Sequence, residues 1–148
     1  MFIGEFFYTI DNKGRVVMPA GFRSELKGKL YVSRGFDRCL YVYDEHEWQA
    51  QQERLVKMSE FGQEERNLKR LIYSGMNEVS FDGQGRLKLS QPLLNYAVIE
   101  KDVAIVGVNS RIEIWDKAKW ELFLAQNEAD IERLAGHIDS KIHNSRKD

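Results

Sequence analysis

The sequence predicts an α+β fold built from two tandem copies of one small module, each with short antiparallel strands followed by helices. The first observation is a turn motif, Asp11-Asn-Lys-Gly14-Arg15, which returns as Asp82-Gly-Gln-Gly85-Arg86 with an offset of 71 residues. The second is that β-rich segments precede helical ones in both halves. The third is a hydrophobic content of 43% over 148 residues, which is enough for a packed core.

The repeat extends well beyond the turn motif once the offset widens to 72 residues. Five further positions then match in kind: Gly35 with Gly107, Leu40 with Ile112, Val42 with Ile114, Asp44 with Asp116 and Trp48 with Trp120. The repeat predicts a first module at residues 1–75 and a second at residues 76–148, the second ending in a polar C-terminal tail.

A hairpin opens the first module. Residues 6–10 are aromatic and β-rich, and residues 15–18 resume an extended run that Pro19 interrupts. In the turn between them, the Asp11 side chain can hydrogen-bond the loop backbone, and Gly14 can take a positive φ without a Cβ clash.

Two more strands, at residues 30–32 and 39–43, precede the predicted helices of the first module. Asp44 is placed to open a helix at 45–58, and a second helix is predicted at 64–73. Helical spacing puts apolar residues on one side of each: Trp48, Leu55 and Met58 on the first, Leu68, Leu71 and Ile72 on the second.

The second module repeats the order, with strands at 78–81, 86–89, 103–106 and 111–115 and a helix from Lys117. In the segment Arg86-Leu-Lys-Leu89, a strand would direct Arg86 and Lys88 outward together. Ser90 stands where Pro19 stands in the first module, with Pro92 two residues later, so we expect a different bend there. The final dozen residues are polar and predict a frayed end.

Composition narrows the class of protein. The net charge is -1, but residues 1–40 hold 7 Lys and Arg against 4 Asp and Glu, so a nucleic-acid site would be a local basic strip repeated by assembly. No stretch has the roughly 20 apolar residues of a membrane helix, which predicts a cytosolic protein. Cys39 is the only cysteine, so we expect a packed thiol.

The two Asp-x-x-Gly-Arg hairpins, the Gly35/Gly107 pair, the segment 112–116 and the Trp48/Trp120 helices together resemble the MraZ family over nearly the whole chain. This resemblance implies two AbrB-like (SpoVT-AbrB) swapped-hairpin modules intertwined as a pseudo-dimer. It also implies protomers joined in a ring that binds DNA through the Asp-x-x-x-Arg segments. The implied target is the promoter of the division and cell-wall gene cluster, with repression as the outcome.

The residue types alone also indicate that the arginines of the turn motifs could bind DNA. A guanidinium can grip a phosphate or pair bidentately with guanine from a strand laid in the major groove. The predicted DNA-binding residues are Arg15, Arg86, Lys13, Gln84 and Lys88, and the predicted motif-positioning residues are Asp11, Gly14, Asp82 and Gly85. The alternative is that each Asp and Arg form only a structural ion pair.

Other candidates have simpler interpretations. Trp48 and Trp120 could stack on bases, but we expect them to pack in the core. The basic loop at 34–38 could contact either DNA or a neighbouring protomer. The three histidines, His46, His137 and His143, are expected on the surface. We find no convincing nucleophile, phosphate-cradling glycines or metal-ligand spacing, so we predict no enzyme, no metal, no cofactor and no small-molecule substrate.

The sequence therefore predicts a homo-oligomeric DNA-binding transcription regulator, cytoplasmic and associated with the nucleoid, that represses by occluding a promoter with repeated sites. The alternative is a protein-interaction or antitoxin-like module with docking faces on the acidic helices at 44–72 and 117–134. The operator sequence, the number of protomers, the pairing of helices 45–58 and 64–73 within or between protomers, and the module that dominates DNA contact all stay open.

Overall fold

The computed structural model describes residues 1–147. It contains two compact units, Met1–Lys117 and a second from Ala118 onward. The strands lie in the first unit: β1 Glu5–Thr9, β2 Arg15–Val17, β3 Leu30–Arg34, β4 Leu40–Asp44, β5 Asn77–Val79, β6 Arg86–Lys88, β7 Asp102–Val108 and β8 Arg111–Asp116. Its helices are α1 Ala20–Glu25, the short 3-10 helix η1 Phe36–Arg38, α2 Glu45–Val56, α3 Gln63–Ser74 and α4 Gln91–Ala97.

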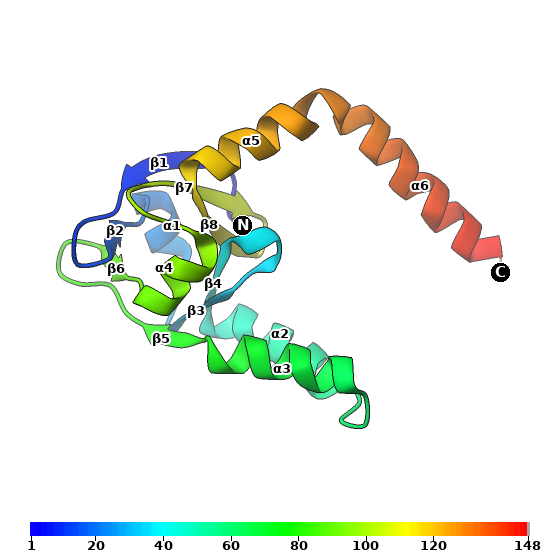
Figure 1. Ribbon diagram of the computed structural model, residues 1–148, viewed down its shortest axis with the longest axis horizontal. Helices are drawn as coiled ribbons and strands as arrows, with labels where there is room; N and C mark the ends of the chain where they lie inside the picture. The colour runs from blue at the N-terminus through cyan, green and yellow to red at the C-terminus, as the bar shows by residue number, and fades with distance from the viewer. Residues whose placement is uncertain (148) are drawn as a thin grey trace. The chain divides into compact units, whose positions relative to one another are not determined.

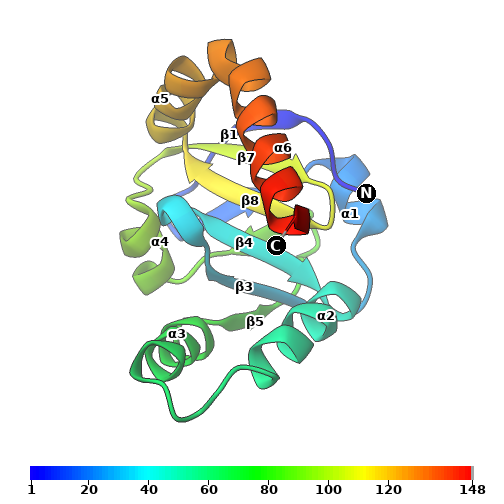
Figure 2. The same ribbon diagram turned by 90° about the vertical axis from the view of Figure 1, so that its right-hand side faces the viewer.

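Six strands form one antiparallel sheet in the order β1-β7-β8-β4-β3-β5, and β2 and β6 form a separate two-stranded ribbon. Figure 2 shows the sheet face on, from β1 at the top to β5 at the bottom. The predicted strands are confirmed, with bounds that differ by a few residues.

The two halves of the repeat are interlocked by strand pairing. β1 pairs with β7, β4 with β8, β3 with β5 and β2 with β6, so each of these contacts joins a strand of the first half to one of the second. Under the 71- to 72-residue offset, the sheet order read from either edge is the same. The predicted α+β fold with tandem, intertwined modules is therefore confirmed.

The main core lies on one face of the sheet. Alternate strand residues such as Val32, Val42, Ile105 and Ile114 are fully buried there, as period-two alternation requires. The β2–β6 ribbon and the helices α1 and α4 cover this face (Figure 1). The ribbon is thus backed by the core, which fixes the turns at its ends.

Two short helices, α1 and α4, occupy segments where the sequence analysis placed none. The predicted order, strands first and helix last, is wrong in this respect, because each second strand exits directly into a helix. Pro19 (φ -50°, ψ 136°) precedes α1, and Ser90 (φ -70°, ψ 153°) precedes α4. These backbone angles are similar, so the expected difference in bend is not found.

The opposite face of the sheet carries a second, smaller core with α2 and α3. Asp44 caps α2 as predicted, since its Oδ1 accepts a hydrogen bond from the Glu47 backbone N–H at 2.9 Å. Trp48 and Leu55 are buried, and Ile72 from α3 packs on the same cluster. The two helices therefore pair within one chain, which the sequence left open. Leu71, however, is exposed, contrary to its predicted packing role.

The second unit is helical, with α5 Lys117–Asn127 leading into a 3-10 turn, η2 Glu128–Asp130, and α6 Ile131–Lys147. Trp120 stacks on Phe123, with ring centroids 5.1 Å apart. The predicted frayed end is wrong for residues up to 147, and Asp148 lies outside the described residues. The α6 helix is amphipathic, although most of its residues are polar or charged. Four apolar residues recur in it at helical spacing: Ile131, Leu134, Ile138 and Ile142.

Two smaller predictions are confirmed, one for the cysteine and one for the histidines. Cys39 is buried, its Sγ contacts the Phe36 carbonyl at 3.2 Å, and burial raises the pKa of the thiol. The three histidines are exposed. Within residues 1–147, no helix is long and apolar enough to cross a membrane.

Candidate nucleic-acid interface

The two turn motifs lie at opposite ends of the β2–β6 ribbon. Val16 and Leu87 face each other across it and point into the core, with exposed fractions of 1% and 0%. The residues on either side of them must therefore face outward. The sequence prediction that Arg86 and Lys88 share the outer face of a strand is confirmed, and Arg15 lies directly opposite Lys88.

In the first turn, the Asp11 carboxylate organises the loop backbone. Its Oδ1 accepts hydrogen bonds from the backbone N–H groups of Lys13 and Arg15, both at 2.9 Å. Its Oδ2 accepts from the Arg15 Nε at 2.6 Å. The Gly14 N–H closes the turn on the Asp11 carbonyl at 3.1 Å. One carboxylate therefore sets both the loop and the direction of the arginine.

The second turn repeats this arrangement bond for bond. The Asp82 Oδ1 accepts from the backbone N–H groups of Gln84 at 2.9 Å and Arg86 at 3.0 Å, and its Oδ2 accepts from the Arg86 Nε at 2.8 Å. The Gly85 N–H closes the turn on the Asp82 carbonyl at 3.0 Å. The sequence repeat is thus also a repeat of hydrogen-bond geometry.

These bonds favour the ionised carboxylates. Backbone donation from the Arg15 N–H is the main cause that lowers the pKa of Asp11 to about 2. Donation from the Arg86 N–H likewise lowers the pKa of Asp82. Both turns therefore keep their hydrogen bonds throughout the neutral pH range.

Each arginine is anchored at one nitrogen and open at the others. Within residues 1–147, Nη1 and Nη2 of Arg15 and Arg86 donate no hydrogen bond, although the Arg86 Nη1 lies 3.8 Å from the Asp11 Oδ2. Their side chains are 29% and 22% exposed. The predicted ion pair and a DNA contact are thus compatible, because each aspartate accepts from the Nε of its own arginine and leaves the terminal nitrogens without a hydrogen bond within residues 1–147.

The remaining predicted contacts surround these two arginines. Lys13 and Gln84 occupy matching exposed positions in the two turns, and Lys88 is exposed on β6. At the place in β2 that matches Lys88, the first half has Val17, which is 37% exposed. The second half therefore carries one more cation on the outer face of the ribbon than the first.

The glycines of the two turns have positive φ, 78° for Gly14 and 72° for Gly85. A Cβ at Gly14 would lie 2.7 Å from the backbone oxygen of Leu89, whereas a Cβ at Gly85 would meet the guanidinium of Arg23. Glycine is therefore required sterically at the first turn. At the second it faces a side chain that can move.

Arg23 lies beside this surface although no signal in the sequence predicts it there. It comes from α1, and its Nη1 donates to the Gly85 carbonyl at 3.4 Å, next to the second turn. Leu94 holds the matching place beside Gly14. No repeated pattern marks Arg23, because its counterpart is apolar; only the packing of α1 against the ribbon brings it there.

Two other candidates are not part of this surface. Trp48 is buried in the second core, as expected. In the loop at 34–38, the Arg34 Nη1 donates to the Leu71 carbonyl at 2.6 Å, and Arg34 and Arg38 both lie over the Tyr96 ring. These arginines are engaged by side chains and backbone of the same chain.

The arrangement presents a narrow antiparallel ribbon whose outer face carries guanidinium and ammonium donors. A two-stranded ribbon fits the major groove of B-DNA, where arginine forks pair with guanine edges or grip phosphates. Within residues 1–147, no group of three His, Cys, Asp or Glu side chains is arranged to hold a metal ion.

The chain is similar to known proteins over nearly its whole length. The family model described as "MraZ protein, putative antitoxin-like" matches the chain twice, over residues 1–71 and 72–137. A "Transcriptional regulator MraZ" of Finegoldia magna is 43% identical over 94% of this chain and 97% of its own length. Proteins of that name from Desulforamulus reducens and Limosilactobacillus fermentum are 41% and 42% identical, over 93% and 94% of this chain and 97% of their own lengths.

Proposed function

Because this chain belongs to the MraZ family, we propose that it is a sequence-specific DNA-binding regulator of transcription that binds through the outer face of the β2–β6 ribbon. The observation that carries the proposal is the pair of arginines, Arg15 and Arg86, each held at Nε by the aspartate of its own turn, with terminal nitrogens that donate no hydrogen bond within residues 1–147. Lys13, Gln84 and Lys88 add phosphate or base contacts around them.

The aspartates and glycines of the turns act as positioning residues in this proposal. A carboxylate repels phosphate, so Asp11 and Asp82 contribute by fixing the guanidinium plane rather than by touching DNA. A side chain that is already fixed before binding loses less conformational entropy when it contacts DNA. Gly14 and Gly85 allow the tight turn that makes this possible.

One ribbon offers few cations, so we propose that the protein binds as a homo-oligomer, a ring of protomers that engages repeated promoter sites. Multivalency then converts weak contacts into useful affinity. The exposed apolar stripe of α6 supports assembly, since such stripes normally pack against a partner. In this proposal residues 1–75 and 76–148 are the two modules. The ring represses the promoter of the division and cell-wall gene cluster by blocking access of the polymerase. The protein then acts in the cytoplasm, associated with the nucleoid.

The test is fluorescence-anisotropy binding to that promoter region at two salt concentrations. Arg15→Ala and Arg86→Ala should each weaken binding at least about fivefold, in line with about 1 to 3 kcal/mol for one bidentate contact. Arg70→Ala is the matched control, because Arg70 is exposed on α3 and, among the described residues, hydrogen-bonds only Asn67. Circular dichroism and analytical ultracentrifugation should show unchanged fold and assembly in all variants.

Unchanged promoter affinity in a folded Arg15→Ala, Arg86→Ala double variant would contradict the proposal. The protein-interaction alternative is favoured by the same α6 stripe, which would then bind a different protein. Salt separates the two functions: binding set by phosphate contacts falls steeply with ionic strength, whereas docking on an apolar stripe does not.

A further inference from the structure

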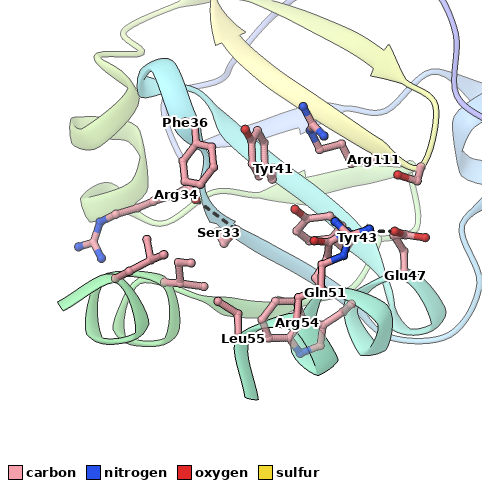
Figure 3. A pocket seen from close by; sticks show the side chains of 14 residues that line it. Ser33, Arg34, Phe36, Tyr41, Tyr43, Glu47, Gln51, Arg54, Leu55 and Arg111 are labelled. Atoms are coloured by element: carbon pink, nitrogen blue, oxygen red, sulfur yellow. Dashed lines mark hydrogen bonds between the residues drawn. The ribbon is translucent and has the colours of Figure 1, made fainter. Parts of the chain in front are cut away.

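A pocket of about 400 Å³ opens on the face of the sheet that carries α2 and α3, opposite the ribbon (Figure 3). Its volume lies within the range of small-molecule sites. Strands β4 and β8 provide Tyr41, Tyr43 and Arg111, and α2 provides Glu47, Trp48 and Arg54. All the lining residues belong to the first compact unit. Nothing in the sequence repeat indicates this pocket, and the sequence predicts no small-molecule site.

The walls of the pocket are aromatic and mutually packed. The Trp48 ring lies 6.1 Å from that of Tyr43 and 5.8 Å from that of Tyr73, and Tyr41 contacts Tyr43 edge-on at 6.1 Å. Rings held by several neighbours do not collapse easily into an empty space. A flat apolar group therefore finds a preformed surface on which to stack.

Two polar atoms in this wall make no hydrogen bond to any of the described residues. Tyr43 and Trp48 are each 7% exposed, yet within residues 1–147 neither the Tyr43 hydroxyl nor the Trp48 Nε1–H makes a hydrogen bond. Among these residues, no side-chain polar atom that is wholly buried lacks a partner, so both atoms keep a small opening to solvent. Because both residues line the pocket, we place that opening in the pocket, where a ligand can reach it.

The charges around the pocket favour an anion. Three arginines line it, against the single carboxylate of Glu47. Glu113 neutralises Arg111 through contacts of 2.7 and 2.8 Å, whereas Arg34 donates to neutral oxygens. Arg54 has no hydrogen-bond or ion-pair partner within residues 1–147.

We propose that this pocket binds a small planar aromatic anion, with its ring stacked on the Tyr41, Tyr43 and Trp48 wall and its carboxylate held by Arg54. The Tyr43 hydroxyl and the Trp48 Nε1–H then donate to the ligand. The Trp48 Nε1–H and the Arg54 guanidinium can only donate, and the Tyr43 hydroxyl can donate as well as accept, so a carboxylate complements all three groups.

The matching positions of the second half strengthen this assignment. Glu113 and Trp115 occupy the places of Tyr41 and Tyr43 on the same face of the sheet. There the Trp115 Nε1–H donates to the Glu113 Oε1 at 3.0 Å, so the donor is already satisfied. The Tyr43 hydroxyl, at the matching position of the first half, makes no hydrogen bond within residues 1–147.

Naphthalene-1-carboxylate tests the proposal, with the uncharged naphthalene-1-carboxamide as its matched probe. The readout is the ¹⁵N–¹H signal of the three indole groups, assigned with Trp48→Phe and recorded on the full chain without DNA. We expect the carboxylate to shift the Trp48 signal in a saturable way and to bind at least tenfold more tightly than the amide. Arg54→Gln and Tyr43→Phe should each weaken it several-fold, while the control Arg70→Gln should not.

Equal affinity for the two probes, or undiminished binding by a folded Arg54→Gln variant, would overturn the assignment. So would a Trp48 signal that moves with protein concentration and is restored by Ile138→Asp, because α6 of a second copy would then occupy the pocket. These outcomes are independent of the DNA measurements, since the pocket and the ribbon lie on opposite faces of the sheet.

Discussion

Matching residues of the two halves are alike on one face of the sheet and differ on the other. On the ribbon side, Asp11 and Asp82 make the same set of hydrogen bonds to matching backbone N–H groups and arginines. On the other side, the matching pairs are chemically different: Tyr41 and Tyr43 in the first half stand where Glu113 and Trp115 stand in the second.

The difference shows which parts of a repeat its geometry constrains. A tight turn with a carboxylate cap tolerates few side chains, because both the positive φ and the hydrogen-bond distances must be met. A sheet face that lies under helices accepts any set of side chains that fills its volume. Pseudo-symmetry is therefore strict in the turns and loose in the pocket. The predictions below probe that contrast within the matched pairs of the ribbon.

The largest expected effect is in the core beneath the ribbon. Leu87 and Val16 are matching residues that face each other with almost no exposure. Leu87→Ala should lower the free energy of unfolding by about 3 kcal/mol and Val16→Ala by about 2 kcal/mol, since a larger volume is lost at Leu87. Urea unfolding measures both. A larger loss at Val16 would show that the two halves do not share one packed core here.

The glycines of the turns should differ more than their similar φ values suggest. Gly14→Ala brings a Cβ against the backbone oxygen of Leu89, and we expect a loss of about 2 kcal/mol. Gly85→Ala meets only the end of the Arg23 side chain, so about 1 kcal/mol is expected. Thermal unfolding of the two variants side by side checks this. Equal losses would mean that the positive φ alone sets the cost.

The stability of the fold should depend on the ionisation of the two turn aspartates. Asp11 has a pKa of about 2 in the folded protein against 3.8 for an unperturbed aspartate, so its stabilising contribution is complete above pH 4 and is lost as the pH falls towards 2. The stability difference between wild type and Asp11→Asn should therefore shrink between pH 4 and pH 2. Urea titrations across this range measure it.

Asp82→Asn is the matched comparison for that experiment. The pKa of Asp82 is also lowered, mainly by donation from the Arg86 backbone N–H, so its stability difference should likewise shrink as the pH falls. A difference that stays constant with pH for both variants would show that the turn hydrogen bonds do not depend on the charge of the carboxylates.

The smallest effect is expected on the outer face of β2. Val17→Lys gives the first half the cation that Lys88 provides in the second. If the ribbon binds DNA as proposed, affinity should rise a few-fold at low salt and the logarithmic salt dependence should steepen by about one phosphate contact. Anisotropy titrations at several salt concentrations test this, with the exposed Val56→Lys on α2 as control. An equal gain from both variants would point to a non-local charge effect.

The sequence predicted the strands and the long helices because their signals are local. Alternation in residues 30–34 and 40–44, the Asp44 cap and the repeated turns each depend on a few neighbouring residues. The short helices α1 and α4 lack such signals, because six or seven residues show too little periodicity. The α6 helix was missed because its apolar residues are spread thinly through a charged segment.

The candidate interface was predictable in part for the same reason. The motif residues are close together in the sequence, and their repetition is enough to mark them as candidates. Arg23 and the pocket at Tyr43 and Trp48 were not predictable, since both arise from the packing of segments distant in the chain. Position within the repeat carries no information about side chains that the repeat does not share.

The exchange of strands between halves also has a consequence for how the chain acquires its fold. The first half, as it leaves the ribosome, lacks the partners of β1, β2 and one edge each of β3 and β4, which all come from residues 77–116. Such long-range pairing slows folding, and the strand edges of the first half stay unpaired until the second half has been synthesised. A released first half has a self-complementary edge, because β2 could pair with β2 of another copy. Premature termination of translation would thus yield aggregation-prone fragments. The chain should depend most on chaperones while its second half is being synthesised.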